Sequence, residues 1–178
     1  MSRNLLFYSA FVFLISGCAS FGPAVPAPVH TSAVQSVAPP APSAPPTSPR
    51  AERAEVLLQA LLALGLDYRY GGTSPVTGFD CSGLVAYIYQ EAWGIRLPRN
   101  AKAQSEAGTP VSLAELQPGD LVFYDTQNRP FSHVGIYLGD GKFVYAPKSG
   151  EQVRVGSLKS TYWTQRFNGA RRIELSPL

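Results

Sequence analysis

The residue best suited to chemistry in this 178-residue sequence is Cys81, within Gly78-Phe79-Asp80-Cys81-Ser82-Gly83-Leu84. Asp80 is a favourable N-cap, so Cys81 is predicted to occupy the first turn of an apolar helix that ends at Gly94. Unpaired N–H groups and the positive end of the helix dipole favour a thiolate there. A thiolate is the nucleophilic form of cysteine, so the pattern predicts attack on a carbonyl group. A buried, inert cysteine is the alternative interpretation.

A possible base for Cys81 is His133, the only histidine within residues 50–178. Residues 132–138 alternate as a strand does, which places Val134 and Ile136 on one face and His133 on the other. A cysteine at a helix start and a histidine on a later strand form the papain-like arrangement for thiol catalysis. An isolated histidine without a function is the alternative. One cysteine and one histidine without clustered carboxylates do not supply a zinc site, so no metal is expected.

Two glycine positions near the cysteine predict close backbone packing. Gly83 lies inside the expected helix, where glycine costs about 1 kcal/mol relative to alanine. Its presence therefore predicts that another backbone or a substrate approaches the helix at this point. Gly71-Gly72 would let the chain turn sharply toward Cys81.

The hairpin after His133 decides which side chain lies beside the imidazole. A three-residue loop at Gly139-Asp140-Gly141 places Val144 opposite Ile136 and Tyr145 on the same face as His133, whereas a two-residue turn moves Tyr145 to the other face. The three-residue loop is favoured because it gathers the apolar residues Val134, Ile136, Leu138, Val144 and Ala146 on one side.

The amino terminus has the pattern of an export signal. Arg3 precedes an apolar run over residues 5–15, which is short for a membrane span but suits a signal peptide. Ile15-Ser16-Gly17-Cys18 resembles a lipobox, which implies a signal peptide over residues 1–17 and lipid on Cys18; an ordinary cleaved signal is the alternative. Lipidation would anchor the chain in a membrane and leave Cys81 without a disulfide partner. Ala19 after the cysteine suggests, by analogy with Gram-negative sorting, the periplasmic face of the outer membrane.

Composition separates a tether from a folded domain. Proline and alanine dominate residues 18–49, which cannot bury enough apolar area to fold and are expected to form a flexible tether. Residues 50–178 are the predicted domain. The part from residue 51 onward holds all 12 acidic and 13 of the 15 basic residues, a formal charge of +1. This near-neutral balance supplies no excess of positive charge of the kind that attracts nucleic acid.

The domain pattern predicts an α+β fold. Ser48-Pro49 opens a helix that should end at Gly65. Strands are expected at residues 121–124, 132–138, 142–146, 152–155 and 170–175, with a loop or helical turn over 157–167. The first helix is expected to bury one apolar stripe in the core: Val56, Leu57, Leu58, Leu61, Leu62 and Leu64.

Several short motifs together resemble the NlpC family of cell-wall cysteine peptidases. They occur in the family's order and spacing and cover nearly the whole domain. They are Tyr68-Arg69-Tyr70-Gly71-Gly72, Phe79-Asp80-Cys81-Ser82-Gly83-Leu84, Leu97-Pro98-Arg99, Pro118-Gly119-Asp120-Leu121-Val122-Phe123, His133-Val134-Gly135-Ile136-Tyr137-Leu138-Gly139 and Ala170-Arg171-Arg172-Ile173. The resemblance implies a papain-like α+β fold, in which the nucleophile helix packs on an antiparallel sheet of about five or six strands. It also implies hydrolysis of peptide bonds in peptidoglycan stem peptides without a cofactor.

The resemblance also assigns roles to individual residues. Cys81 corresponds to the nucleophile, His133 to the general base and Tyr68 to a tyrosine of the oxyanion site. It also implies that Asp80, Ser82 and Arg99 bind substrate. Tyr145 departs from the pattern, because the residue that orients the catalytic histidine in this family is usually a second histidine. A tyrosine hydroxyl can accept a hydrogen bond from imidazole, so Tyr145 is a possible orienter of His133.

The leading functional hypothesis is a lipid-anchored endopeptidase that cuts peptidoglycan stem peptides through a thioester on Cys81. The alternative, from a different functional class, is a catalytically weak or inactive lipoprotein. Such a protein would bind peptidoglycan or act as a scaffold for other wall enzymes. A transferase or amidase with the same acyl-enzyme chemistry is the third hypothesis. The motifs leave open whether the scissile bond lies within a stem or in the cross-link between stems, and they indicate no protein partner.

Overall fold

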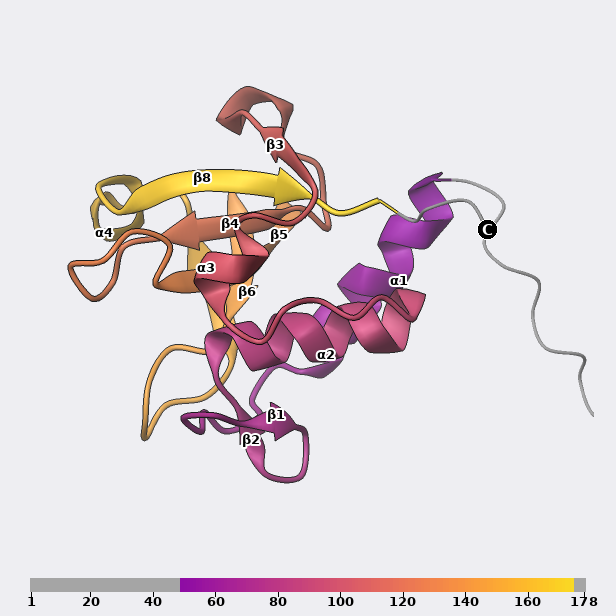
Figure 1. The fold of residues 1–178 in the computed structure, drawn as a ribbon, viewed down its shortest axis with the longest axis vertical. Coiled ribbons are helices and arrows are strands. Elements are labelled where there is room, and N and C mark those ends of the chain that lie inside the picture. Colours follow the sequence, from indigo (N-terminus) through magenta and orange to yellow (C-terminus); the bar gives the residue numbers. More distant parts are fainter. Residues whose placement is uncertain (1–48, 175–178) are drawn as a thin grey trace, which may run out of the picture. The chain divides into compact units, whose positions relative to one another are not determined.

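The computed structural model describes residues 49–174, and the predictions for the signal peptide, Cys18 and the tether up to residue 48 lie outside them (Figure 1). The helices are α1 (Pro49–Leu62), α2 (Cys81–Trp93), α3 (Ala101–Gln104) and α4 (Thr161–Thr164), with a short 3-10 turn, η1 (Leu113–Glu115). The strands are β1 (Thr73–Ser74), β2 (Gly78–Phe79), β3 (Thr109–Val111), β4 (Leu121–Tyr124), β5 (His133–Gly139), β6 (Lys142–Tyr145), β7 (Arg154–Ser157) and β8 (Phe167–Arg172). Among these described residues, no helix is long and apolar enough to cross a membrane.

The centre of the fold is a six-stranded sheet in the order β3-β8-β4-β5-β6-β7. All of its neighbouring strands pair antiparallel, as expected for an α+β fold with five or six strands. The strands β1 and β2 form a separate two-stranded ribbon beside the start of α2 (Figure 1). The strand that carries His133 therefore lies inside the sheet, between β4 and β6.

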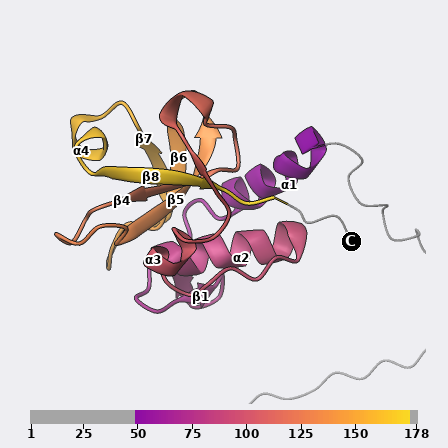
Figure 2. The ribbon, with the colours of Figure 1, turned by 45° about the horizontal axis from the view of Figure 1, so that its top comes forward.

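The nucleophile helix α2 covers one face of the sheet, and α4 lies on the other side (Figure 2). Leu84, Val85 and Ile88 of α2 are fully buried, as the apolar stripe predicted. They pack in one cluster with Val134 and Ile136 of β5. Because Cys81 is the first residue of this buried helix, helix packing fixes the position of its sulfur.

The opposite face of the sheet carries an aromatic cluster built around Trp163 of α4. Tyr124, Tyr137, Phe143 and Tyr145 are buried with it. Ring centroids of Trp163 lie 4.6 Å from Tyr124, 5.1 Å from Phe143 and 4.9 Å from Tyr145. The His133 ring lies next to this cluster, where it stacks on Trp163.

The hairpin between β5 and β6 has the predicted register. Ile136 pairs with Val144, and the chain turns through Gly139, Asp140 and Gly141, all of which have positive φ. Tyr145 consequently lies on the face of His133, and the two ring centroids are 5.5 Å apart.

The prediction for the buried stripe of α1 is confirmed at Val56 but is wrong for most of its leucines. Leu58, Leu61, Leu62 and Leu64 are exposed, and the buried positions are the smaller Val56, Ala60 and Ala63. This face of small residues packs in the same core cluster as α2. Short side chains therefore fill the narrow space between the two helices, which leucines would overfill. The helix itself begins at Pro49, as Ser48-Pro49 predicted, and thus takes in the residue assigned to the end of the tether.

The outer strands differ from the sequence prediction in position. The strand predicted at 152–155 is β7 at Arg154–Ser157, and the strand predicted at 170–175 is β8 at Phe167–Arg172. Gln152 forms only an isolated bridge with Asp67. Strand β3 at Thr109–Val111 was not predicted, because a three-residue strand that contains a proline has no detectable period.

Candidate active site

Cys81 lies at the first turn of α2, where the structure confirms the predicted cap. Asp80 is the N-cap, and its carboxylate accepts a hydrogen bond of 2.7 Å from the backbone N–H of Gly83. Cys81 is a free, half-buried cysteine. Its thiol is within range of the backbone N–H of Val134, the residue that follows His133 in β5. The fold thus places the sulfur against the start of the strand that carries the only histidine of residues 50–178.

The protonation state of Cys81 differs from the sequence prediction. Burial and the charge of Asp80 raise the pKa of the Cys81 thiol to about 11. The N–H groups of Val134, Ser82 and Cys81 lower this pKa, as a helix start should, but they do not offset the loss of water. The pKa of the thiol therefore lies above its ordinary value, and not below it as the helix start predicted.

Asp80 holds the loop before the helix together with Ser82 and Arg99. The guanidinium of Arg99 donates to both carboxylate oxygens of Asp80, at 2.9 and 2.8 Å, and to the hydroxyl of Ser82 at 2.8 Å. Burial raises the pKa of Asp80, but the hydrogen bonds from Arg99 and Gly83 outweigh it and hold that pKa below its usual value. The structure therefore brings the three residues assigned to substrate binding into one charged cluster at the nucleophile.

Gly83 explains how the preceding loop can lie so close to the helix. A Cβ atom at this position would sit 2.0 Å from the carbonyl oxygen of Gly72, which is closer than any real contact. The same carbonyl accepts a hydrogen bond of 3.0 Å from Arg99. The predicted close approach at Gly83 is thus a backbone contact with the Gly71-Gly72 turn.

Tyr68 lies beside Cys81 and is half-buried, before the Gly71-Gly72 turn. Burial raises the pKa of its phenol, and the nearby Cys81 and Asp80 raise that pKa further. The phenol is therefore a hydrogen-bond donor at neutral pH. Such a donor suits the oxyanion that forms when a nucleophile attacks a carbonyl group.

His133 is buried, with 5% of its surface exposed, and its environment is aromatic. Its ring stacks on Trp163 with a centroid distance of 5.6 Å and an interplanar angle of 23°. Burial lowers the pKa of the imidazole to about 4, so His133 is neutral at pH 7 and able to act as a base. Its Nε2 atom is buried without a hydrogen-bond partner among the described residues.

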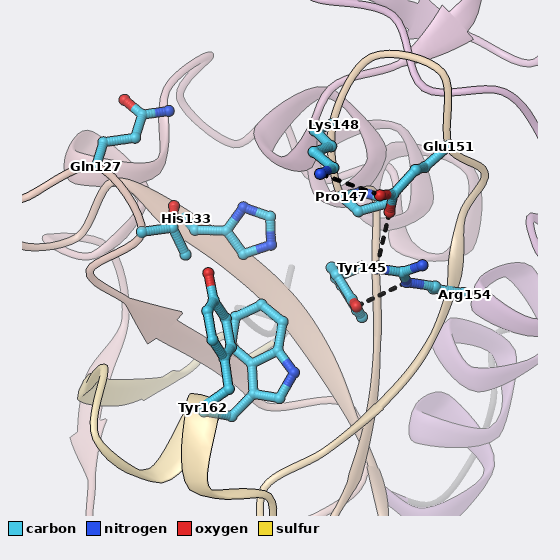
Figure 3. A pocket seen from close by; sticks show the side chains of 10 residues that line it. Gln127, His133, Tyr145, Pro147, Lys148, Glu151, Arg154 and Tyr162 are labelled. Carbon is cyan, nitrogen blue, oxygen red and sulfur yellow. Dashed lines mark hydrogen bonds and ion pairs between the residues drawn. The ribbon is translucent and has the colours of Figure 1, made fainter.

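Tyr145 contacts His133 through its ring and not through its hydroxyl. The two rings meet edge to face at 5.5 Å. The hydroxyl oxygen instead accepts a hydrogen bond of 2.8 Å from Nε of Arg154, which in turn forms a 2.8 Å ion pair with Glu151 (Figure 3). The predicted hydrogen bond between the Tyr145 hydroxyl and His133 is therefore absent, because Arg154 occupies that oxygen.

Trp163 and Arg154 are the residues near the site that sequence reasoning missed. Trp163 lies in the segment predicted as a loop or helical turn, and the short helix α4 carries it onto the imidazole. Arg154 lies at the start of β7 and reaches Tyr145 across the pair of strands β6 and β7. No motif marks either residue: Arg154 lies in the strand predicted at 152–155, and Trp163 lies in the predicted loop or helical turn over 157–167.

A metal centre is not built into the described part of the chain. Within residues 49–174 no group of three or more histidine, cysteine, aspartate or glutamate side chains lies close enough to hold a metal ion.

Comparisons with known proteins agree with this geometry. The chain is 46% identical over 113 residues to Murein DD-endopeptidase MepH of Escherichia coli, and 42% identical over 120 residues to Gamma-DL-glutamyl hydrolase of Bacillus subtilis. These matches cover 62% and 67% of this chain but only 42% and 29% of the relatives, so the chain spans less than half their length. The crystal structure of the NlpC/p60 domain of peptidoglycan hydrolase SagA superimposes with a TM-score of 0.59 at 34% identity, covering 68% of this chain and 98% of that domain.

The structural likeness confirms the predicted papain-like α+β fold, with the nucleophile helix packed on an antiparallel sheet. The family model of NlpC/P60 matches residues 65–172, which include every motif of the site from Tyr68 to His133. This match covers more than half of the chain, and the chain belongs to the NlpC/P60 family.

Proposed function

We propose that this protein is an endopeptidase that hydrolyses peptide bonds in peptidoglycan stem peptides, with Cys81 as nucleophile and His133 as general base. The observation that carries the proposal is the placement of a free thiol at the start of α2, against the backbone next to His133. The names of the relatives support the substrate class, since one is a murein endopeptidase and the other a glutamyl hydrolase.

The neutral states of the two groups define the first step. The neutral imidazole of His133 accepts the thiol proton on one of its two ring nitrogens. As the proton moves, the sulfur attacks the scissile carbonyl carbon and forms a tetrahedral intermediate. The developing oxyanion accepts hydrogen bonds from the N–H groups at the start of α2 and from the hydroxyl of Tyr68.

Collapse of the intermediate breaks the carbon–nitrogen bond. The imidazolium of His133 donates its proton to the leaving nitrogen, which departs as an amine, and the acyl group remains on Cys81 as a thioester. In the second half-reaction His133 takes a proton from water as the water oxygen attacks the thioester carbon. The carbon–sulfur bond then breaks, His133 returns the proton to the sulfur, and the acyl half leaves as a carboxylic acid. The Asp80–Ser82–Arg99 cluster beside Cys81 is positioned to hold the acyl half of the substrate.

We also propose that lipid on Cys18 anchors the protein to the periplasmic face of an outer membrane. The support is the lipobox-like Ile15-Ser16-Gly17-Cys18 after a short apolar run, together with the proline-rich tether that follows. Labelling with a radioactive fatty acid tests this proposal, since the wild-type chain should take up label and Cys18→Ala should not. Equal labelling of both would contradict it.

Digestion of purified peptidoglycan, with mass analysis of the released fragments, tests the enzymatic proposal. The wild type should release fragments with a cut stem peptide or a cut cross-link, and the masses identify which bond is broken. Cys81→Ala and His133→Ala should release none above background. Release of whole stems from the sugar would indicate an amidase. Binding of peptidoglycan without any new fragment would indicate a scaffolding protein.

A further inference from the structure

The proposed reaction places a positive charge on the buried ring of His133. The imidazole becomes an imidazolium in both half-reactions, first with the proton of the thiol and then with a proton of water. Only 5% of the surface of His133 is exposed, and burial is what lowers the pKa of this imidazole. Water therefore does little to stabilise the imidazolium, and a group of the protein has to do so.

The charged side chains that line the pocket beside His133 are paired with one another. They are Lys148, Glu151 and Arg154. The Glu151 carboxylate lies 2.8 Å from Arg154 and 3.4 Å from Lys148 (Figure 3). Arg154 also donates a hydrogen bond to the Tyr145 hydroxyl. Glu151 thus already faces two cations and is not left over to balance a charge on the imidazole.

The groups at the start of α2 do not balance this charge either. The thiol of Cys81 lies against β5, but its sulfur gives up any negative charge when it bonds to the carbonyl carbon. The Asp80 carboxylate forms a 2.8 Å ion pair with Arg99. Among the described residues, no carboxylate raises the pKa of His133.

The indole of Trp163 covers one face of the His133 ring. The two ring centroids are 5.6 Å apart, and the rings are inclined by 23°. A cation within about 6 Å of an aromatic centroid is attracted by the electron-rich face of the ring, and tryptophan gives the strongest such interaction. The neutral imidazole gains less from this face, so the contact favours the protonated ring.

Trp163 is fixed in this position by its surroundings. It packs with Tyr124, Phe143 and Tyr145 in the aromatic cluster, and only 8% of its surface is exposed. The hydroxyl of Thr164 ties α4 to the preceding turn through two backbone carbonyl groups, at 2.8 and 2.9 Å. The indole is therefore in place before the imidazole receives a proton.

We propose that Trp163 is a positioning residue that stabilises the imidazolium form of His133 through a cation–π contact. The contact replaces the hydrogen bond expected from the Tyr145 hydroxyl, which is bound to Arg154 instead. This role rests on the proposed function, because the imidazolium is an intermediate of the proposed reaction. The protonation equilibrium of His133 can nevertheless be measured without cleavage.

Fluorinated tryptophans test the contact while they keep the packing, because fluorine withdraws electrons from the face of the indole and adds little volume. The sequence has two tryptophans, so in Trp93→Phe the mono-, di- and trifluorinated amino acids label position 163 alone. The kcat for a muropeptide should fall with each fluorine, to about tenfold below the unlabelled variant, and KM should stay within about twofold.

The wild-type chain, labelled at both positions, is the control. Its kcat should fall by the same factor per fluorine, because Trp93 packs on Tyr89 near the end of α2. A steeper fall in the wild type would assign that excess to position 93 and would weigh against the proposal. An effect on KM alone overturns the proposal, because Trp163 would then only pack against the substrate.

NMR titration of the imidazole supplies the measurement without cleavage. The sequence has two histidines, so His30→Gln in the same background leaves the signal of His133 alone. The pKa of His133 should fall by about one unit between tryptophan and trifluorotryptophan at position 163. A pKa that does not depend on fluorine overturns the proposal, whatever the effect on kcat.

The two measurements also separate the proposal from the proposed function. A pKa that falls while kcat stays constant overturns the role of Trp163 in turnover and leaves the proposed function standing. Failure of the wild type to cleave any muropeptide overturns the proposed function, and the fluorine dependence of the pKa then decides alone whether Trp163 stabilises the imidazolium.

Discussion

Burial shifts the pKa values of Cys81 and His133 in the directions that favour the neutral thiol and the neutral imidazole. Burial raises the pKa of the thiol to about 11 and lowers the pKa of the imidazole to about 4. Both shifts oppose proton transfer from thiol to imidazole before substrate binds. This arrangement differs from a preformed thiolate–imidazolium pair.

The reactivity of Cys81 toward iodoacetamide reports on this neutral pair. With a pKa of about 11, only about one thiol in 10⁴ is ionised at pH 7, so alkylation should be slower than that of a free cysteine. Because the thiolate fraction grows with pH, the rate should keep rising beyond pH 9. Mass spectrometry of the Cys81 peptide measures the rate. A fast rate that stays constant down to pH 5 would instead demonstrate an ion pair.

The Tyr145 hydroxyl contributes little to catalysis if its partner is Arg154. Tyr145→Phe keeps the ring that contacts His133 and removes only the hydrogen bond to Arg154. We expect kcat to fall less than about fivefold, the effect of one ordinary hydrogen bond. A loss of a hundredfold or more in steady-state kinetics would mean that the hydroxyl binds the imidazole during turnover.

At the scale of the elements, the position of Cys81 depends on how closely the Gly71-Gly72 turn approaches α2. The Asp80 cap and the Arg99 guanidinium tie this turn to the helix start, through bonds to the Gly71 N–H and the Gly72 carbonyl. The absence of a side chain at Gly83 makes this contact possible.

Gly83→Ala should therefore disturb the site even though alanine favours helices. Its Cβ would force the Gly72 carbonyl away, and such overpacking costs about 1–3 kcal/mol, more than the gain of about 1 kcal/mol in helix propensity. We expect a lower free energy of unfolding in urea and a loss of activity. Glu91→Ala, at an exposed position of the same helix, is the control and should change neither. Unchanged activity in Gly83→Ala would show that the turn is not needed in its observed place.

Features that depend on local chemistry could be predicted from the sequence, and those that depend on distant packing could not. Asp80 caps α2 and the Gly139-Asp140-Gly141 loop sets the hairpin register, because each effect is decided within a few residues. The buried face of α1 was mispredicted, because leucines surround this helix and only contact with α2 selects the alanine side. The position of Trp163 on His133 depends on how α4 folds back over the sheet, and no period or motif records that.

Across the whole molecule, the side chain of Asp120 connects the sheet to the turn before β4 and to helix α1. This buried carboxylate accepts two hydrogen bonds from Arg172 of β8, at 2.9 and 2.8 Å, and one of 2.7 Å from the backbone N–H of Gln117. Arg53 of α1 lies 3.7 Å away. The Pro118-Gly119-Asp120 motif thus has a structural role, because Asp120 connects the turn before β4 to both β8 and α1.

Asp120→Asn should destabilise the protein without changing its chemistry. Loss of the charge leaves Arg172 and Arg53 beside a neutral group, and breaking such a buried pair costs about 3 kcal/mol. The free energy of unfolding in urea measures the loss, and kcat at a temperature where the variant is folded should stay within about twofold of the wild type. Asp140→Asn, at an exposed turn position, is the control for stability. A fully stable Asp120→Asn would remove this structural assignment.

The intact mass of the protein, quenched with acid during turnover of a muropeptide, tests whether Cys81 is the nucleophile. We expect a transient mass increase equal to the acyl half of the substrate, located by digestion at Cys81 and released by hydroxylamine, as a thioester should be. Cys81→Ser should show no such hydroxylamine-labile thioester. Turnover without any adduct at Cys81, or cleavage by Cys81→Ala at the wild-type rate, would contradict the claim that this thiol is the nucleophile.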